Sequence, residues 1–142
     1  MNPFTPEQQQ RIIDAIRQAE LATSGEIRVH IEQQCPETDP IKRAIQVFAD
    51  LQMHETQEQN GVLIYLAPGA RKFAIIGDVG INTRVPAGFW DSTKDHMRQH
   101  FAVGDYTEGL CQGIREAGQQ LKQFFPRSSS DTNELSNDIS FS

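Results

Sequence analysis

Two apolar runs separated by a short turn are the feature that most constrains the fold of this chain. Residues 62–66 (VLIYL) and 73–76 (FAII) have the length and the β-branched and aromatic content of buried strands. The linking segment Pro68-Gly69-Ala70 has the composition of a tight reversal, which predicts an antiparallel hairpin. Asn60 and Asp78 stand at the two ends of this unit. The interior of the hairpin therefore predicts a core, and its ends predict a place that a ligand can reach.

The N-terminal segment predicts a helix followed directly by a strand. Thr5 is a helix N-cap, Pro6 suits the first helical position, and Gln8 stands three residues after the cap, so a helix should start here and run to about residue 22. Gly25 is typical of a helix stop. In residues 26–32 (EIRVHIE) polar and apolar side chains alternate, which predicts a half-buried strand.

Three further amphipathic segments predict helices that cover the sheet. They span about residues 41–54, 86–101 and 107–124, and Asp105 or Thr107 is a suitable cap for the last of them. The order α-β-α-β-β-α-α indicates an α/β protein with a small mixed sheet, which the loops can extend by another short strand.

Length and composition predict a single α/β domain over residues 1–125, followed by a flexible acidic C-terminal tail over residues 126–142. The net charge of −6 argues against nucleic-acid binding, which normally needs a basic face. The polar N-terminus and the short apolar runs, of which residues 62–67 are the longest, predict no secretory signal and no membrane span. We therefore expect a soluble, cytoplasmic monomer.

Signatures of covalent catalysis and of structural zinc are absent from the sequence. Cys35 and Cys111 lie far apart without metal-ligand spacing, so free thiols are expected. His96 and His100 are four residues apart on a predicted helix, an arrangement more typical of a solvated face than of a metal site.

Loop carboxylates are the better candidates for chemistry. Asp78 follows a buried strand between glycines, and Asp105 follows Gly104 before a helix. Calcium and magnesium prefer several oxygen ligands, and acidic and amide side chains in the predicted loops can supply them. Each residue also has a purely structural interpretation, as a helix cap, a turn residue or a solvated charge. The candidate metal ligands are Glu26, Asn60, Asp78, Asp105 and Glu108.

An ordered set of segments resembles the TPM-domain family, whose founding members include a thylakoid-lumen acid phosphatase linked to photosystem II repair. The segments that carry the resemblance extend over almost the whole chain, and we expect the compact soluble branch of the family, without the signal peptide and C-terminal membrane anchor of many relatives. They are FTPEQQQRIIDAIRQAE, TSGEIRVHI, NGVLIYLAPGARKFAIIGDVGI, the FWD at residues 89–91, AVGDYTEGL and NELSNDISF.

The resemblance implies a Rossmann-like three-layer α/β/α sandwich, with phosphatase activity in some members and binding of calcium or another divalent ion in others. Ser24-Gly25 stands where many relatives have Thr-Gly, which keeps a hydroxyl. The family's polar positions fall on Glu26, Asn60, Arg71, Asp78 and Asp105.

Three functions remain open at this point. The first is a divalent-cation-binding domain, for Ca²⁺ or Mg²⁺, with a regulatory or assembly role. The second is a phosphomonoester hydrolase in which Asp78 or Asp105 holds a metal or activates water and Arg71 neutralises the phosphate. The third is a protein-interaction module anchored on Phe89-Trp90 and Tyr106. The absence of an identifiable nucleophile and base ranks cation binding first.

Overall fold

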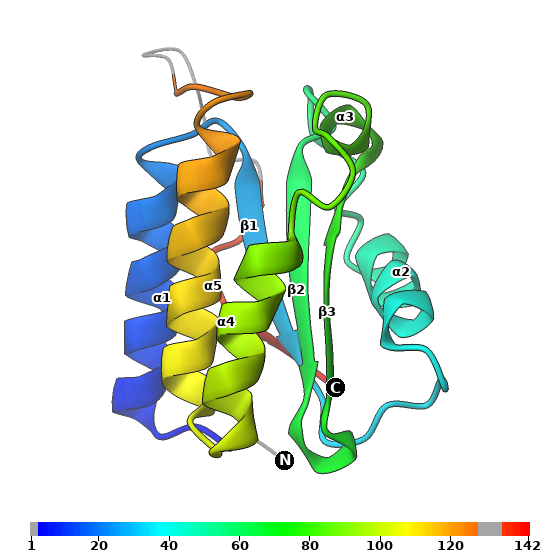
Figure 1. Cartoon of the computed structure of the whole chain (residues 1–142), viewed down its shortest axis with the longest axis vertical. Helices are drawn as coiled ribbons and strands as arrows, with labels where there is room; N and C mark the ends of the chain where they lie inside the picture. The colour runs from blue at the N-terminus through cyan, green and yellow to red at the C-terminus, as the bar shows by residue number, and fades with distance from the viewer. Residues whose placement is uncertain (1–2, 128–134) are drawn as a thin grey trace.

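The computed structural model describes residues 3–127 and 135–142, and it shows an α/β fold built on a four-stranded mixed sheet. The strand order is β3-β2-β1-β4, and Figure 1 shows the sheet between a layer of α1, α4 and α5 and a second layer formed by α2. Strands β1 and β2 are parallel, β4 is parallel to β1, and β3 is antiparallel to β2. This is the expected three-layer sandwich. The strands are β1 (Glu26–Ile31), β2 (Gly61–Ala67), β3 (Lys72–Gly77) and β4 (Ser140–Phe141).

Caps and prolines define most helix starts. Thr5 forms the predicted capping box with Gln8, and Asp39 caps α2 by accepting a hydrogen bond from the Ile41 N–H. Asp105 caps α5 in the same way through the Glu108 N–H. The helices are α1 (Pro6–Glu20), α2 (Pro40–Asp50), α3 (Val79–Asn82), α4 (Asp91–Ala102) and α5 (Tyr106–Leu121), and the 3₁₀ turn η1 is Pro68–Ala70.

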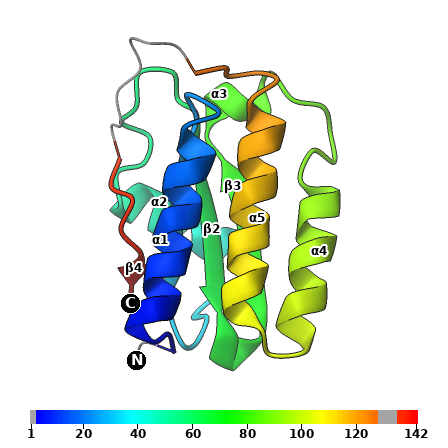
Figure 2. The same ribbon diagram turned by 90° about the vertical axis from the view of Figure 1, so that its left-hand side faces the viewer.

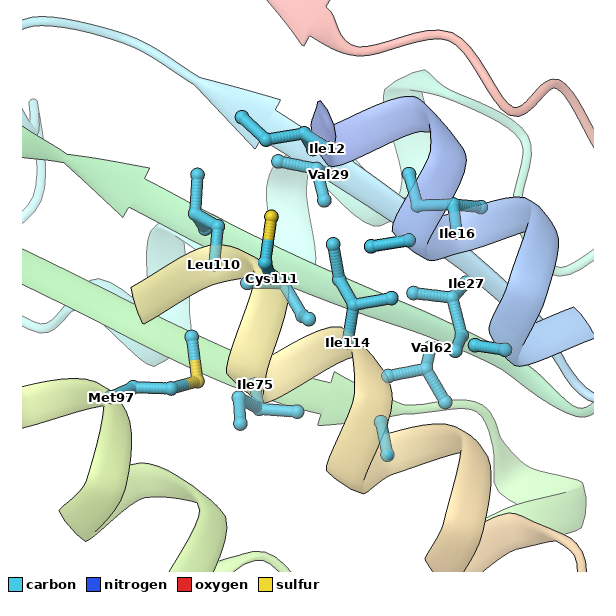
Figure 3. Close-up of a cluster of buried hydrophobic side chains, with 14 of the residues drawn as sticks. Ile12, Ile16, Ile27, Val29, Val62, Ile75, Met97, Leu110, Cys111 and Ile114 are labelled. Atoms are coloured by element: carbon cyan, nitrogen blue, oxygen red, sulfur yellow. The ribbon is translucent and has the colours of Figure 1, made fainter. Parts of the chain in front are cut away.

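The sheet separates two apolar clusters, because successive strand residues face opposite layers. Ile64 of β2 faces the larger cluster, beneath α1, α4 and α5, whereas Leu63 and Tyr65 face the smaller cluster beneath α2. Figure 3 shows part of the larger cluster, in which side chains of α1 and α5 meet those of the strands. Figure 2 shows that α1, α5 and α4 lie in a row over this face.

Two parts of the sequence interpretation need correction. The helix expected from residue 86 begins at Asp91, because Gly88 takes a left-handed φ of 76° that interrupts a helix. The last residues of the expected flexible tail form strand β4, which pairs His30 with Ser140 and Ile31 with Phe141. A two-residue strand has no periodicity to detect, so only its pairing partner reveals it. No helix within residues 3–127 and 135–142 is long and apolar enough to cross a membrane.

Candidate functional site

The five predicted metal ligands do not converge, because they lie at two ends of the sheet. Asp78 follows β3 beside the start of β2, and its N–H donates to the Gly61 carbonyl at 2.9 Å. Asp105 lies at the other end, between the end of α4 and the start of α5, as Figure 1 shows for those elements. The expected meeting of Asp78 with Asp105 is therefore wrong.

At the Asp105 end, one acidic side chain caps a helix and the other is paired with arginines. Asp105 Oδ1 accepts the Glu108 N–H at 3.2 Å, which is a helix cap. Glu108 forms ion pairs of 2.8 Å with both Arg11 and Arg115. Hydrogen bonding to Arg115, and then to Arg11, outweighs partial burial and holds the pKa of Glu108 below its usual value. These carboxylates stabilise the start of α5 and are poor candidates for a cation.

The Asp78 end brings together oxygen atoms from two loops, and we call Glu58, Asn60 and Asp78 the amino-end rim. Asn60 is buried, and its Nδ2 lies 3.3 Å from Ser24 Oγ and 3.5 Å from Glu58 Oε2. Asp78 Oδ1 accepts the Val79 N–H at 2.7 Å and so caps the short α3. Its Oδ2 is shielded from solvent and accepts no hydrogen bond from the described residues.

The two loops of the rim are in direct contact. Gly80 N–H donates to the Gln59 carbonyl at 2.9 Å. A Cβ at position 80 would stand only 2.3 Å from the Glu58 carbonyl oxygen and 2.5 Å from that of Gln59. Only glycine permits this approach, which places backbone carbonyls close to the turn that follows Asp78.

Glu26 is buried beside the rim but its carboxylate is already in use. Glu26 Oε1 accepts the Leu135 N–H at 2.6 Å, so it holds the C-terminal segment against the start of β1. Nearby, Glu20 Oε2 accepts the Ile27 N–H at 3.0 Å. Burial raises the pKa of Glu20 to about 7, and the neighbouring Glu26 adds to this effect. Sequence reasoning missed Glu20, because a glutamate at a helix end normally indicates solvent.

A bound cation at the rim would need backbone carbonyls and water to complete its coordination. Within the described residues, no group of three or more His, Cys, Asp or Glu side chains is placed to hold a metal. The donors that remain are one Asp carboxylate, one amide oxygen, an exposed Glu and loop carbonyls. This oxygen-only set suits a hard cation that keeps part of its hydration shell.

Arg71 lies at the other end of β3 from Asp78. The intervening strand, Lys72–Gly77, separates them by roughly 20 Å at about 3.4 Å per residue. Arg71 lines a pocket of about 510 Å³ together with Lys72, Arg98 and Tyr106. One phosphate therefore cannot contact both Asp78 and Arg71, and the predicted catalytic combination of these two residues is not assembled.

The aromatic and histidine candidates have structural partners. Trp90 is only 9% exposed and packs edge-to-face on Phe89, while Tyr106 packs on Phe101 at the opposite end of α4, so they form no common exposed patch. His96 lies 2.9 Å from Glu116, and His100 lies 2.6 Å from Gln112. Both histidines thus connect α4 to α5. Cys35 and Cys111 are free thiols, as expected.

Comparisons with known proteins agree with this architecture. The chain is similar to BA42 from the psychrophilic bacterium Bizionia argentinensis, with 45% identity, a TM-score of 0.93, and coverage of 99% of this chain and 97% of that one. No match is found among curated proteins.

Two more distant structures share the fold. The N-terminal domain of cg2496 from Corynebacterium glutamicum has 15% identity and a TM-score of 0.66, over 94% of this chain and 82% of that one. An N-terminal domain from P. gingivalis has 21% identity and a TM-score of 0.68, over 86% of this chain and 78% of that one. The TPM domain family matches residues 2–120, and the chain therefore belongs to the TPM-domain family.

Proposed function

We propose that this TPM domain binds one divalent cation, Ca²⁺ or Mg²⁺, at the amino-end rim and has a regulatory or assembly role. The observation that carries the proposal is Asp78 Oδ2, which is removed from solvent and accepts no hydrogen bond from the described residues. A carboxylate oxygen without water or a donor is unfavourable unless something positive meets it.

The proposed set of cation ligands is smaller than the set that the sequence predicted. Asp78 would provide the charged ligand, and the Asn60 side-chain oxygen, Glu58 and the nearby loop carbonyls would provide the others. Asp105 and Glu108 are excluded from the set because they lie at the other end and Glu108 is paired with two arginines. A cation at the rim would tie the loop before β2 to the turn after β3, and its effect would therefore be on the mobility of these loops.

A matched pair of variants tests this proposal. Asp78→Asn removes the charge but keeps a side chain that can cap α3, and Asp105→Asn does the same at the cap of α5. Wild type and Asp105→Asn should show a calcium- or magnesium-dependent rise in Tm, which at ten times the Kd corresponds to about 1.4 kcal/mol. Asp78→Asn should show none.

The location can be read independently of Tm. In an NMR titration with CaCl₂ or MgCl₂, amide shifts should concentrate in residues 58–61 and 77–81 of the wild type. No response at millimolar ion, or an Asp78→Asn variant that responds like the wild type, would contradict the proposal.

A specific observation favours phosphomonoester hydrolysis as the second candidate. Arg71, Lys72 and Arg98 line one pocket, and such a group of cations can hold a phosphate. Asp105 follows Gly104, which also lines the pocket, although its own carboxylate caps α5. In this version Arg71→Ala should reduce hydrolysis of an aryl phosphate at least tenfold, while Asp78→Asn should keep the wild-type rate. Equal rates for Arg71→Ala and wild type would exclude it.

A further inference from the structure

The outer edge of β3 has backbone groups that point away from the sheet. Antiparallel pairing alternates hydrogen-bonded and non-hydrogen-bonded residues, and the bond from Asp78 N–H to the Gly61 carbonyl fixes that alternation. Phe73, Ile75 and Gly77 therefore direct their N–H and C=O groups outward. The contact from Asn82 Nδ2 to the Gly77 carbonyl, 3.1 Å long, agrees with this direction. Within the described residues, the outward groups of Phe73 and Ile75 have no hydrogen-bond partner.

An apolar groove follows the same edge. We define the β3 edge groove as the pocket of about 450 Å³ that lies between α2, β3, the turn after β3 and Trp90, and its lining includes Ile41, Ile45, Ile75, Asp78 and Val79. Ile41 is 44% exposed and Ile45 57% exposed, although both are large and apolar. With Val79, they make up three of the six exposed large hydrophobic side chains of the described residues, all lining one pocket. Such concentration on one site indicates a binding surface.

The shape of the edge selects an isolated strand over a second copy of this chain. Figure 1 looks onto β3, with α4 on one side and α2 on the other. Side chains from α2 and Trp90 flank the pocket that has β3 residues in its wall. A second copy would bring its own flanking helices to the same place, whereas a single extended peptide brings only its backbone and alternate side chains.

The different charges at the two ends of the β3 edge would orient a bound peptide. The start of β3 lies beside Arg71 and Arg98, and the outward-facing Phe73 lines the pocket that contains them. Arg98 lies over the Phe73 ring at 5.5 Å and pairs with Asp95, whereas Arg71 forms no ion pair within the described ranges. Asp78 stands at the far end of the groove. One end of the edge is therefore basic and the other acidic.

We propose that the β3 edge groove binds an extended peptide segment of another protein, which adds a strand to β3. Its backbone pairs with the outward groups of Phe73 and Ile75, its apolar side chains at every second position fill the groove, and an acidic side chain lies at the Arg71 end. This is recognition by strand addition, in which main-chain hydrogen bonds give affinity and side-chain pockets give specificity. Asp78 borders the groove, but neither the backbone pairing nor the contact with Arg71 needs its carboxylate, so the peptide site does not depend on the proposed function.

The probe is an acetylated, amidated heptapeptide of alternating valine and threonine with one aspartate, made in two versions that carry the aspartate at either end. NMR titration in EDTA, at fixed low protein concentration, measures binding. The matched control peptide is N-methylated at alternate residues, which removes the N–H groups that a strand needs. One of the two aspartate versions should bind, and it should slow the amide hydrogen exchange of Phe73 and Ile75 at least tenfold.

Variants separate the groove from non-specific binding. Ile45→Glu places a charge in the groove on a side chain that is already exposed, and Leu21→Glu is the matched control at an exposed position outside it. Ile45→Glu should weaken binding at least tenfold, and Leu21→Glu should leave it unchanged. Arg71→Glu should weaken binding of the aspartate peptide and strengthen binding of the same peptide with lysine in place of aspartate.

Three results would overturn the proposal. In the first, the peptide causes chemical-shift changes but does not slow hydrogen exchange of the Phe73 and Ile75 amides. In the second, Ile45→Glu binds the peptide as tightly as the wild type, and in the third, exchange of those amides slows with rising protein concentration in the absence of peptide. The last result would assign the edge to a second copy of the chain. Loss of the calcium response in Asp78→Asn would not affect any of these measurements, so the two proposals fail separately.

Discussion

Glu20 shows how a single buried carboxylate makes stability depend on pH. Its side chain is buried against the start of β1, where it accepts the Ile27 N–H. Burial raises its pKa from 4.5 to about 7. Because the folded-state pKa lies above the unfolded one, the protonated form favours folding, and the contribution of Glu20 to the free energy of unfolding falls as pH rises from about 4.5 to about 7.

Glu20→Gln should remove this pH dependence while it keeps an acceptor for Ile27. At pH 8 the variant should be more stable than the wild type, by at most about 3 kcal/mol for a shift of this size, and near pH 4.5 the two should be similar. Urea unfolding at pH 4.5, 6 and 8 measures the difference. Glu55→Gln, at an exposed position, should follow the wild type at every pH. A wild type and a Glu20→Gln variant with parallel pH profiles would contradict the assignment.

At the scale of elements, glycines in α5 determine how closely its neighbours pack. A Cβ at Gly118 would meet Ala19 Cβ at 2.8 Å and Ala19 Cα at 3.1 Å, so α1 would have to move. A Cβ at Gly113 would meet Met97 Sδ at 2.4 Å and Met97 Cγ and Cε at 2.9 Å, but these atoms belong to one flexible side chain that can adopt another rotamer. Position 113 therefore accommodates an added methyl group more easily than position 118.

Gly118→Ala should destabilise the protein and Gly113→Ala should not. Overpacking against α1 costs about 1–3 kcal/mol, and the better helix preference of alanine offsets about 1 kcal/mol of it. We expect Gly113→Ala to lie within about 0.5 kcal/mol of the wild type, because the same helix preference compensates for the displacement of Met97. Urea unfolding measures the free energy of unfolding of both variants, and an equal loss in the two would show that α1 and α4 are displaced equally easily.

Strand β4 is fastened by a buried histidine. His30 Nδ1 lies 2.9 Å from Ser140 Oγ, and its Nε2 lies 2.7 Å from Ser142 Oγ. Burial lowers the pKa of His30, although the nearby Glu32 partly offsets this. With the folded-state pKa below the unfolded one, the neutral ring favours folding, so the contribution of His30 to the free energy of unfolding falls as pH drops through about 6.5.

Deletion of residues 140–142 should expose His30 and raise its pKa toward about 6.5. NMR titration of the imidazole measures this change, with the full-length protein as the control. The truncated protein should also lose less stability than the full-length protein as pH drops through about 6.5. An unaltered His30 titration would mean that β4 does not shield the ring.

Local sequence signals predicted the helices and strands better than the positions of distant residues relative to one another. Alternation, turn composition and cap chemistry are local signals. They predicted the hairpin, the capping box at Thr5 and the placement of Asn60 and Asp78 at the ends of the hairpin sequence. The expected meeting of Asp78 with Asp105 depended on the path of α4. A helix of 12 residues spans about 18 Å, which carries the chain from the Asp78 end to the opposite one.

At the scale of the whole molecule, the two ends of the sheet have different chemistry. The amino-end rim offers oxygen ligands, and the Arg71 end offers cations, with the length of β3 between them. Parallel sheets commonly place ligands at the carboxyl ends of their strands. Here that edge also receives β4, and Glu32, just after β1, is held by Arg43 at 2.7 and 2.9 Å and by Tyr65.

The separation predicts that changes at the two ends act independently. Asp78→Asn and Arg71→Ala should have effects on the free energy of unfolding that add within about 0.5 kcal/mol, because residues this far apart share no partners. The calcium-induced rise in Tm should be absent from Asp78→Asn and from the double variant, and present in Arg71→Ala. Urea unfolding and Tm measurements with and without calcium on the four proteins test both statements. An interaction energy well above that limit would show that β3 transmits strain between its ends, since the strand is the shortest covalent path that joins the two sites.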